Sequence, residues 1–301
     1  MHDHSNGHGH HHHYSEESNI AIAFFLNLSF TIIELIGGTL TNSTAILADA
    51  VHDLGDSLSI GMAWILSRLS KRPSDHSFTY GFQRLTLLGA LINGIILTGG
   101  SAWVLTETIP RLFDPVLPKV EGMFLLAILG VTVNGYAALR LSSGKTLAER
   151  MLNWHLIEDV LGWVAVLIVS IVLYFWQWAL LDALLSFGFT MFILLNVIKT
   201  LYQTIRIFLQ ATPEETNYQK IKDDIRQMPN VSEIHHLHLW SLDGARHVLT
   251  AHIVLNEHVR IDEQKNLKER IRVYLADYQL EHTTIEFEFS DEQCRDDKPT
   301  T

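Results

Sequence analysis

The sequence predicts an α-helical membrane protein in which six transmembrane helices precede a small α+β domain. Six apolar stretches reach about 20 residues, the length that an α-helix needs to cross the hydrocarbon core of a bilayer. The charged residues are distributed unevenly as well: residues 1–210 contain 26 Lys, Arg, Asp and Glu residues, whereas residues 211–301 contain 29. The hydrophobic content of 48% is therefore an average over a membrane region and a water-soluble region.

The predicted membrane domain covers residues 19–210. Its apolar stretches run approximately over residues 20–40, 44–66, 85–107, 120–141, 155–176 and 178–198. All seven prolines lie outside these stretches, as expected for uninterrupted helices. Residues 1–18 predict a disordered His-rich tail, which we interpret either as a native metal-collecting segment or as a purification tag.

Lys and Arg in the short loops predict the orientation of the helices. The loops after the second and fourth stretches are basic, and Lys199 and Arg206 follow the sixth. The loop after the first stretch and the turn between Trp176 and Trp178 contain neither residue type. Because basic loops remain in the cytoplasm, we expect both termini there. Short loops and the lack of an organelle signal favour a bacterial plasma membrane.

After Pro213 the pattern is that of a soluble domain. Residues 214–228 and 261–280 have the spacing of amphipathic helices. Alternation of apolar and polar residues predicts strands at 231–241, 246–256 and 283–289. The order α-β-β-α-β predicts a domain at 211–290 with helices on one face of a sheet, followed by an acidic disordered tail at 291–301.

Groups of closely spaced titratable side chains interrupt two of the apolar stretches. The second stretch contains four of them at positions that share one helical face: Asp49, His52, Asp53 and Asp56. Each aspartate at the centre of a transmembrane helix costs on the order of 3 kcal/mol, so these residues indicate a function or a set of partners. A soluble amphipathic helix is the alternative reading of this stretch.

The fifth stretch repeats one spacing of the second. His155 and Asp159 are four residues apart, as are His52 and Asp56, so each pair lies on one face of its helix. If the two helices meet, the pairs offer two imidazole nitrogens and two carboxylate oxygens, a set that tetrahedral Zn²⁺ accepts. Metal binding requires neutral imidazole and ionised carboxylate, so such a site would exchange Zn²⁺ for protons.

Several classes of protein are not expected. The net charge of −11 argues against nucleic-acid binding, because no basic face is present to neutralise phosphates. A single cysteine, Cys294, excludes a disulfide framework and a Cys-based zinc finger. The chain contains neither a Gly-x-x-x-x-Gly-Lys-Ser/Thr loop nor a His-Glu-x-x-His motif, so neither ATP-driven pumping nor an intramembrane metalloprotease is expected. We therefore do not expect an enzyme.

The sequence resembles the cation diffusion facilitator family of zinc transporters from Asn19 to about Phe289. The resemblance rests on five segments: Ala48–Asp56, His76–Gly81, Leu88–Gly94, Asn153–Gly162 and Ile234–Leu242. It implies a homodimer of six-helix protomers in the lipid bilayer, with cytosolic ferredoxin-like metal-binding domains. It also implies zinc/proton antiport out of the cytosol through a transport site formed by His52, Asp56, His155 and Asp159.

The resemblance further implies a metal site in the cytoplasmic domain. It aligns His235, His252 and Glu286 with the ligands of such a site, with Glu288 as a possible bridging ligand. His238 belongs to the same His-x-x-His motif. Histidines on polar strand faces are often merely solvated, and this reading stays open for each of them.

Two other functions compete with export of Zn²⁺, which could extend to Cd²⁺ or Co²⁺. A membrane zinc sensor would bind the metal without moving it. A cation channel lined by Asp49, Asp53 and Asp56 would conduct without proton counter-movement. Flux and proton measurements separate these alternatives.

Overall fold

The computed structural model describes residues 12–70, 72–141 and 147–296, without the side chains of residues 12–23 and 147–155, among others. The chain divides into two compact units. The first is helical and consists mainly of residues up to 69 and from 88 to 201, and the second is formed by residues 70–87 and from 202 onward. Each unit has an apolar core of its own.

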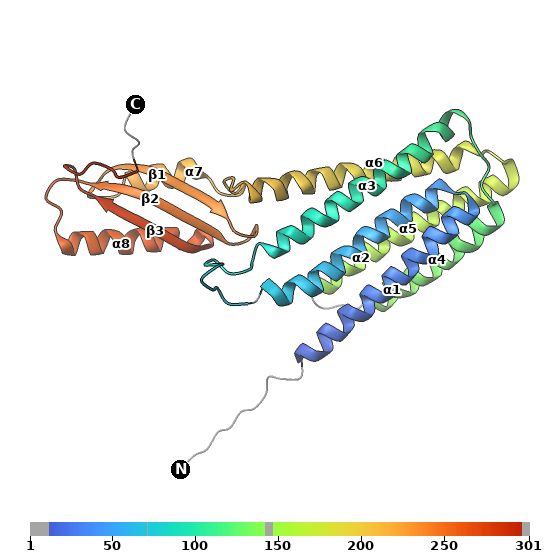
Figure 1. The fold of residues 1–301 in the computed structure, drawn as a ribbon, viewed down its shortest axis with the longest axis horizontal. Coiled ribbons are helices and arrows are strands. Elements are labelled where there is room, and N and C mark those ends of the chain that lie inside the picture. Colours follow the sequence, from blue (N-terminus) through green and yellow to red (C-terminus); the bar gives the residue numbers. More distant parts are fainter. Residues whose placement is uncertain (1–11, 71, 142–146, 297–301) are drawn as a thin grey trace, which may run out of the picture. The chain divides into compact units, whose positions relative to one another are not determined.

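Six long helices form the first unit, and the sixth continues into the second (Figure 1). They are α1 (His12–Thr41), α2 (Thr44–Ser70), α3 (Leu85–Phe113), α4 (Val120–Leu141), α5 (Leu147–Trp176) and α6 (Leu180–Phe208). They follow the order of the predicted apolar stretches. The prediction of a disordered tail at 1–18 is wrong for its last part, because α1 begins at His12. Once formed, a helix gains a hydrogen bond with each added residue, so it can extend beyond its apolar stretch. Residues 1–11 lie outside the described part.

The helices have the composition and surface of membrane spans. Within the described residues, five of them are long and apolar enough to cross a bilayer, and α2 is the exception. Three aspartates lower the mean hydropathy of α2, although its 27 residues are enough to span. Large apolar side chains such as Leu26, Leu125 and Leu195 are exposed on the helix surfaces. Exposed apolar area of this extent is expected where lipid takes the place of water.

Trp163 of α5 is one of the largest fully buried side chains in the core of the helical unit. Its ring belongs to the same buried apolar cluster as Met123 of α4 and Ile46 of α2. Gly130 of α4 lies directly against this ring, and a Cβ atom there would come within 2.1 Å of a ring carbon. The absence of a side chain at Gly130 therefore sets how closely α4 and α5 approach each other.

Helix α3 extends beyond its predicted stretch and includes Pro110. The expectation of proline-free helices therefore does not hold for α3. Proline lacks a backbone N–H and usually breaks a helix interior. Here it lies in the last turn, where its carbonyl still accepts a hydrogen bond from the Asp114 N–H at 2.9 Å.

The C-terminal domain has the predicted order α-β-β-α-β. Its elements are α7 (Tyr218–Arg226), β1 (Val231–Ser241), β2 (His247–Leu255), α8 (Ile261–Leu275), a short 3₁₀ turn η1 (Ala276–Tyr278) and β3 (Leu280–Glu288). The sheet order is β1-β2-β3, with β1 antiparallel and β3 parallel to β2. Apolar residues of α7 and α8 pack with alternate strand residues in one core. The predicted second helix, 261–280, ends earlier because the chain turns at Gln279, whose φ is 53°.

A β-bulge at His236 changes the phase of β1. The pairing with β2 is regular at His235 and resumes at His238, and His236 between them has a φ of 45°. An inserted residue of this kind shifts which side chains face the core. As a result, Leu237 enters the core while His235 lies on the opposite face of the sheet.

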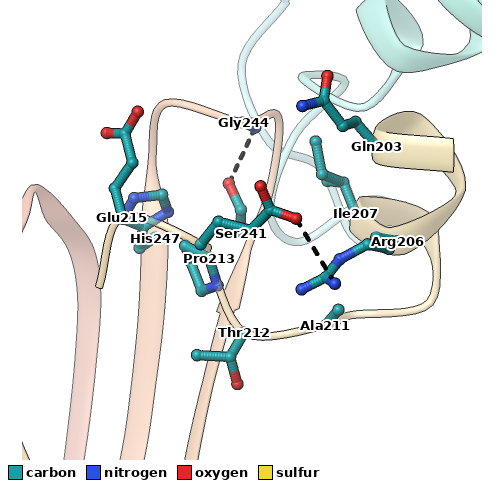
Figure 2. Close-up of a pocket in the computed structure, with 11 residues that line it drawn as sticks. Gln203, Arg206, Ile207, Ala211, Thr212, Pro213, Glu215, Ser241, Gly244 and His247 are labelled. Carbon is teal, nitrogen blue, oxygen red and sulfur yellow. Dashed lines mark hydrogen bonds and ion pairs between the residues drawn. The ribbon is translucent and has the colours of Figure 1, made fainter. Parts of the chain in front are cut away.

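A small cavity of about 230 Å³ lies where the end of α6 meets the domain within the second unit (Figure 2). Arg206 of α6 forms an ion pair with Glu214 of the linker at 3.5 Å. In the hairpin between β1 and β2, the Gly244 N–H donates to Ser241 Oγ at 2.9 Å. The ion pair connects the last turns of α6 to the linker that leads into the domain, and the hairpin lines the other side of the cavity.

Candidate metal centres

The first candidate centre lies between α2 and α5. His52 and Asp56 are one helical turn apart on α2, and Asp159 lies on α5. The His52 Nε2 atom is 3.6 Å from Asp56 Oδ2 and 4.0 Å from Asp159 Oδ1. One ligand atom from each residue lies within 4.8 Å of the other two. We call these three residues the helix cluster.

Other helices enclose the helix cluster. The Phe189 ring of α6 lies edge-on to the His52 ring, with 5.9 Å between their centroids. Asp49 and Asp53, on the same face of α2, are buried, and so is Glu34 of α1. Carboxylates so removed from water need cations, protons or hydrogen bonds as partners. The surroundings therefore favour a positively charged occupant.

The fourth predicted ligand, His155, is placed by its backbone alone. It belongs to α5, one turn before Asp159, and residues with this spacing share a helix face. Its side chain lies outside the described residues. The structure thus brings together three of the four predicted residues, and the role of His155 stays a prediction.

Asp182 of α6 holds the beginning of α2. Its carboxylate accepts hydrogen bonds from Ser43 Oγ at 2.6 Å, the Thr44 N–H at 2.8 Å and Thr44 Oγ1 at 3.0 Å. The first N–H groups of a helix have no partner within the helix, and a carboxylate satisfies them well. Asp182 therefore anchors the helix that carries His52 and Asp56 and is not one of their neighbours in the cluster.

The second candidate centre lies on the face of the sheet opposite α7 and α8. His235 of β1, His252 of β2, Glu288 at the end of β3 and Cys294 beyond it form a group whose ligand atoms lie within 4.8 Å of one another. The Glu288 carboxylate joins the two imidazoles: Oε2 is 2.8 Å from His235 Nε2, and Oε1 is 2.7 Å from His252 Nδ1. We call these four residues the sheet cluster.

The other two predicted residues of this domain lie outside the sheet cluster. Glu286 pairs with His252 in strand register, but its Oε2 atom is 3.8 Å from His252 Nε2 and 2.8 Å from the Arg295 guanidinium. His238 lies opposite Thr250 and is exposed. The carboxylate between the histidines is therefore Glu288.

The environment of Glu288 favours its ionised form. Burial raises the pKa of Glu288, but hydrogen bonds with Cys294 and His252 and the charge of His235 outweigh it, so the pKa lies below its usual value. An ionised carboxylate beside two imidazoles and a thiol is a suitable ligand set for a divalent metal.

Cys294 is the cluster residue that the sequence did not predict. It follows β3 in a segment expected to be disordered, and that expectation is wrong for residues 291–296, which the structure describes. Charged side chains hold this segment in place: Arg295 contacts Glu286 at 2.8 Å, and Asp296 Oδ2 is 3.4 Å from His252 Nε2. A lone cysteine in an acidic stretch gave no sequence signal for this position.

Fold and sites together define a helical membrane protein with one candidate metal centre between its helices and another on its C-terminal α+β domain. Residues 20–209 match the family described as the cation efflux transmembrane domain, and residues 213–289 match the cation efflux protein cytoplasmic domain. The chain belongs to this family, the cation diffusion facilitators, and is a multi-pass membrane protein.

Curated relatives match almost the whole chain. The chain is 32% identical to the cadmium, cobalt and zinc/H⁺-K⁺ antiporter of Bacillus subtilis (strain 168), covering 95% of this chain and 91% of the relative. It is 30% identical to the metal cation efflux system protein CzcD of Cupriavidus metallidurans, covering 96% and 89%. It is also 30% identical to the zinc transporter ZitB of Escherichia coli (strain K12), covering 96% and 92%.

Among solved structures, the metal-bound C-terminal domain of the Cupriavidus metallidurans CzcD transporter matches with 29% identity and a TM-score of 0.22. The match covers 24% of this chain and 99% of that domain.

Proposed function

We propose that this protein exports Zn²⁺ from the cytosol in exchange for protons, and that Cd²⁺ and Co²⁺ are possible further substrates. The observation that carries the proposal is the helix cluster. Two helices that are distant in sequence bring His52, Asp56 and Asp159 within 4.8 Å of one another, inside a domain made of membrane-spanning helices. His155, one turn before Asp159, would complete a site with two nitrogen and two oxygen ligands.

The ligand set supports coupling of metal to protons. Zinc needs neutral imidazole and ionised carboxylate, so its arrival displaces protons and protonation releases it. When the site faces the cytosol at low proton concentration, zinc binds. When it faces a more acidic exterior, protons displace the zinc. The proton gradient can therefore drive export without ATP.

The names of the relatives support the same substrate and direction. They are a cadmium, cobalt and zinc antiporter, a metal cation efflux protein and a zinc transporter, each matched over at least 95% of this chain. The basic loops support cytoplasmic termini in a plasma membrane. The cytoplasmic-domain match supports assembly as a homodimer through the C-terminal domain.

We further propose that the sheet cluster binds a regulatory metal ion. His235, His252 and Glu288 come from three different strands of the domain and meet on one face. Glu286 lies beside this group and contacts Arg295, whereas His238 lies further along β1, opposite Thr250.

Zinc flux into proteoliposomes that contain a lumenal pH dye tests the transport proposal. Wild-type protein should move zinc and protons in opposite directions, and Asp159→Asn and Asp56→Asn should each lower zinc flux at least about tenfold. Even residues outside the first ligand shell change metal affinity by about 10–100-fold. Asp114→Asn, the same change on an exposed loop, is the matched control and should transport like wild type.

The outcomes separate the alternatives. Zinc flux without a proton signal would contradict antiport and favour a channel. Zinc binding without flux would favour a membrane zinc sensor. Full flux in both aspartate variants would show that the helix cluster is not the transport site.

A further inference from the structure

The segment after β3 folds back over the face of the sheet that carries the histidines. The Glu292 N–H donates to the Phe289 carbonyl at 3.0 Å, which forms a turn directly after the strand. Cys294 follows and is 7% exposed. This segment, residues 289–296, thus places the single cysteine of the chain beside the sheet cluster.

The distances around Cys294 suit metal coordination. Its Sγ atom is 3.4 Å from His252 Nδ1. The same sulfur lies within 4.8 Å of one ligand atom of His235 and one of Glu288. In a tetrahedral zinc site with Zn–S of about 2.3 Å and Zn–N of about 2.0 Å, the sulfur and nitrogen are about 3.5 Å apart. The observed separation is therefore close to that of two ligands of one ion.

The neighbours of Cys294 differ from those of a cysteine buried for packing. A structural cysteine usually behaves as a small apolar side chain among other apolar side chains. Here the thiol contacts an imidazole and hydrogen-bonds with the carboxylate of Glu288. A thiolate ligand beside two imidazoles favours zinc or cadmium over oxygen-preferring metals such as Mg²⁺ and Ca²⁺.

We propose that Cys294 is the fourth ligand of the metal site in the C-terminal domain and that metal binding fastens residues 289–296 onto the sheet. The site would then have two nitrogens, one oxygen and one sulfur, with every tetrahedral position filled by protein. Such closed sites hold a metal as part of the structure. The proposal rests on the regulatory metal site proposed above, but it does not depend on export.

Titration of the full-length protein in detergent with Cd²⁺ tests the proposal. Cadmium bound to a thiolate has a ligand-to-metal charge-transfer band in the ultraviolet, and Cys294 is the single thiol of this chain. The wild-type band should rise to saturation with added cadmium and should be absent from Cys294→Ser. His252→Ala should weaken the affinity measured by this band at least about tenfold.

Alkylation of Cys294 gives a second readout that does not need the serine variant to fold. Zn²⁺ should slow alkylation of the wild-type thiol at least about tenfold, because a coordinated thiolate is not free to react. Asp159→Asn should retain both the band and the protection, so loss of export and loss of this site are distinguishable. Absence of the band from the wild-type protein at saturating cadmium, or a band of unchanged affinity in His252→Ala, would overturn the proposal.

Discussion

Asp182 offers a sharp test of how α2 is held in place. The residue is 2% exposed, and its carboxylate accepts hydrogen bonds from Ser43 Oγ, Thr44 Oγ1 and the backbone N–H groups of Thr44 and Ala45, at distances between 2.6 and 3.4 Å. Asp182→Ala would leave these buried donors at the start of α2 without an acceptor. Each buried donor left unsatisfied costs about 1–3 kcal/mol.

We expect Asp182→Ala to lower the free energy of unfolding by about 2–6 kcal/mol, because the two backbone N–H groups stay unsatisfied whereas the two hydroxyl groups can rotate toward other acceptors. Asp182→Asn should lose less, because its amide oxygen still accepts. Thermal unfolding of the purified protein in detergent, followed by tryptophan fluorescence, measures the effect. Asp114→Ala on an exposed loop is the control. An unfolding temperature for Asp182→Ala equal to that of the control would refute this account of the anchor.

Three further predictions concern packing, pH and backbone conformation. Gly130→Ala should destabilise the protein by about 1–3 kcal/mol, because its Cβ would overlap the Trp163 ring. Gly135→Ala on the same helix has open space around the new Cβ and should be neutral or stabilising. Equal unfolding temperatures for the two variants would contradict the packing described for Trp163. Burial lowers the pKa of His247, so the imidazole is protonated less readily in the folded domain than in the unfolded chain. The stability of the domain should therefore fall as the pH drops through about 6.5, the pKa of a histidine in an unfolded chain. Hydrogen exchange of the domain amides at pH 7.5 and 5.5 should show this loss, and His247→Gln should reduce it; an unchanged pH dependence would contradict the assignment. His236→Gly should stabilise the domain by up to about 1 kcal/mol in chemical denaturation, because glycine adopts the positive φ of the bulge without strain, and a loss of stability would contradict this reason.

The membrane helices were predictable in number and order, because five of them have a long apolar stretch and that of α2 is interrupted only by its titratable residues. The ends of the helices were less predictable from hydropathy. Backbone hydrogen bonding continues α1 from His12 and α3 past Pro110, outside the apolar stretches. The pairing of His52 and Asp56 with Asp159 was also predictable. The four-residue spacing places each pair on one face of its helix. Because charged groups are costly in lipid, such faces are expected to lie inside the bundle and to contact each other.

The sheet cluster was predictable only in part. The two histidines, His235 and His252, lie in strands with clear alternation, and their register places them side by side. Glu286 and Glu288 point to the same face, so the sequence could not decide which of them joins the histidines. That choice depends on Arg295, which holds Glu286, and on the path of the chain after β3. Neither the bulge at His236 nor this path has a pattern in the sequence.

The parallel pairing of β3 with β2 has a consequence for the order of folding. His252 and Glu288 are 36 residues apart, and α8 must cross over before β3 can align with β2. During synthesis, a chain that has emerged only as far as β2 carries both histidines but no carboxylate between them. The complete set of ligands exists only after the last strand has been added. A metal ion would therefore bind at this position to the complete domain and not to its nascent precursor.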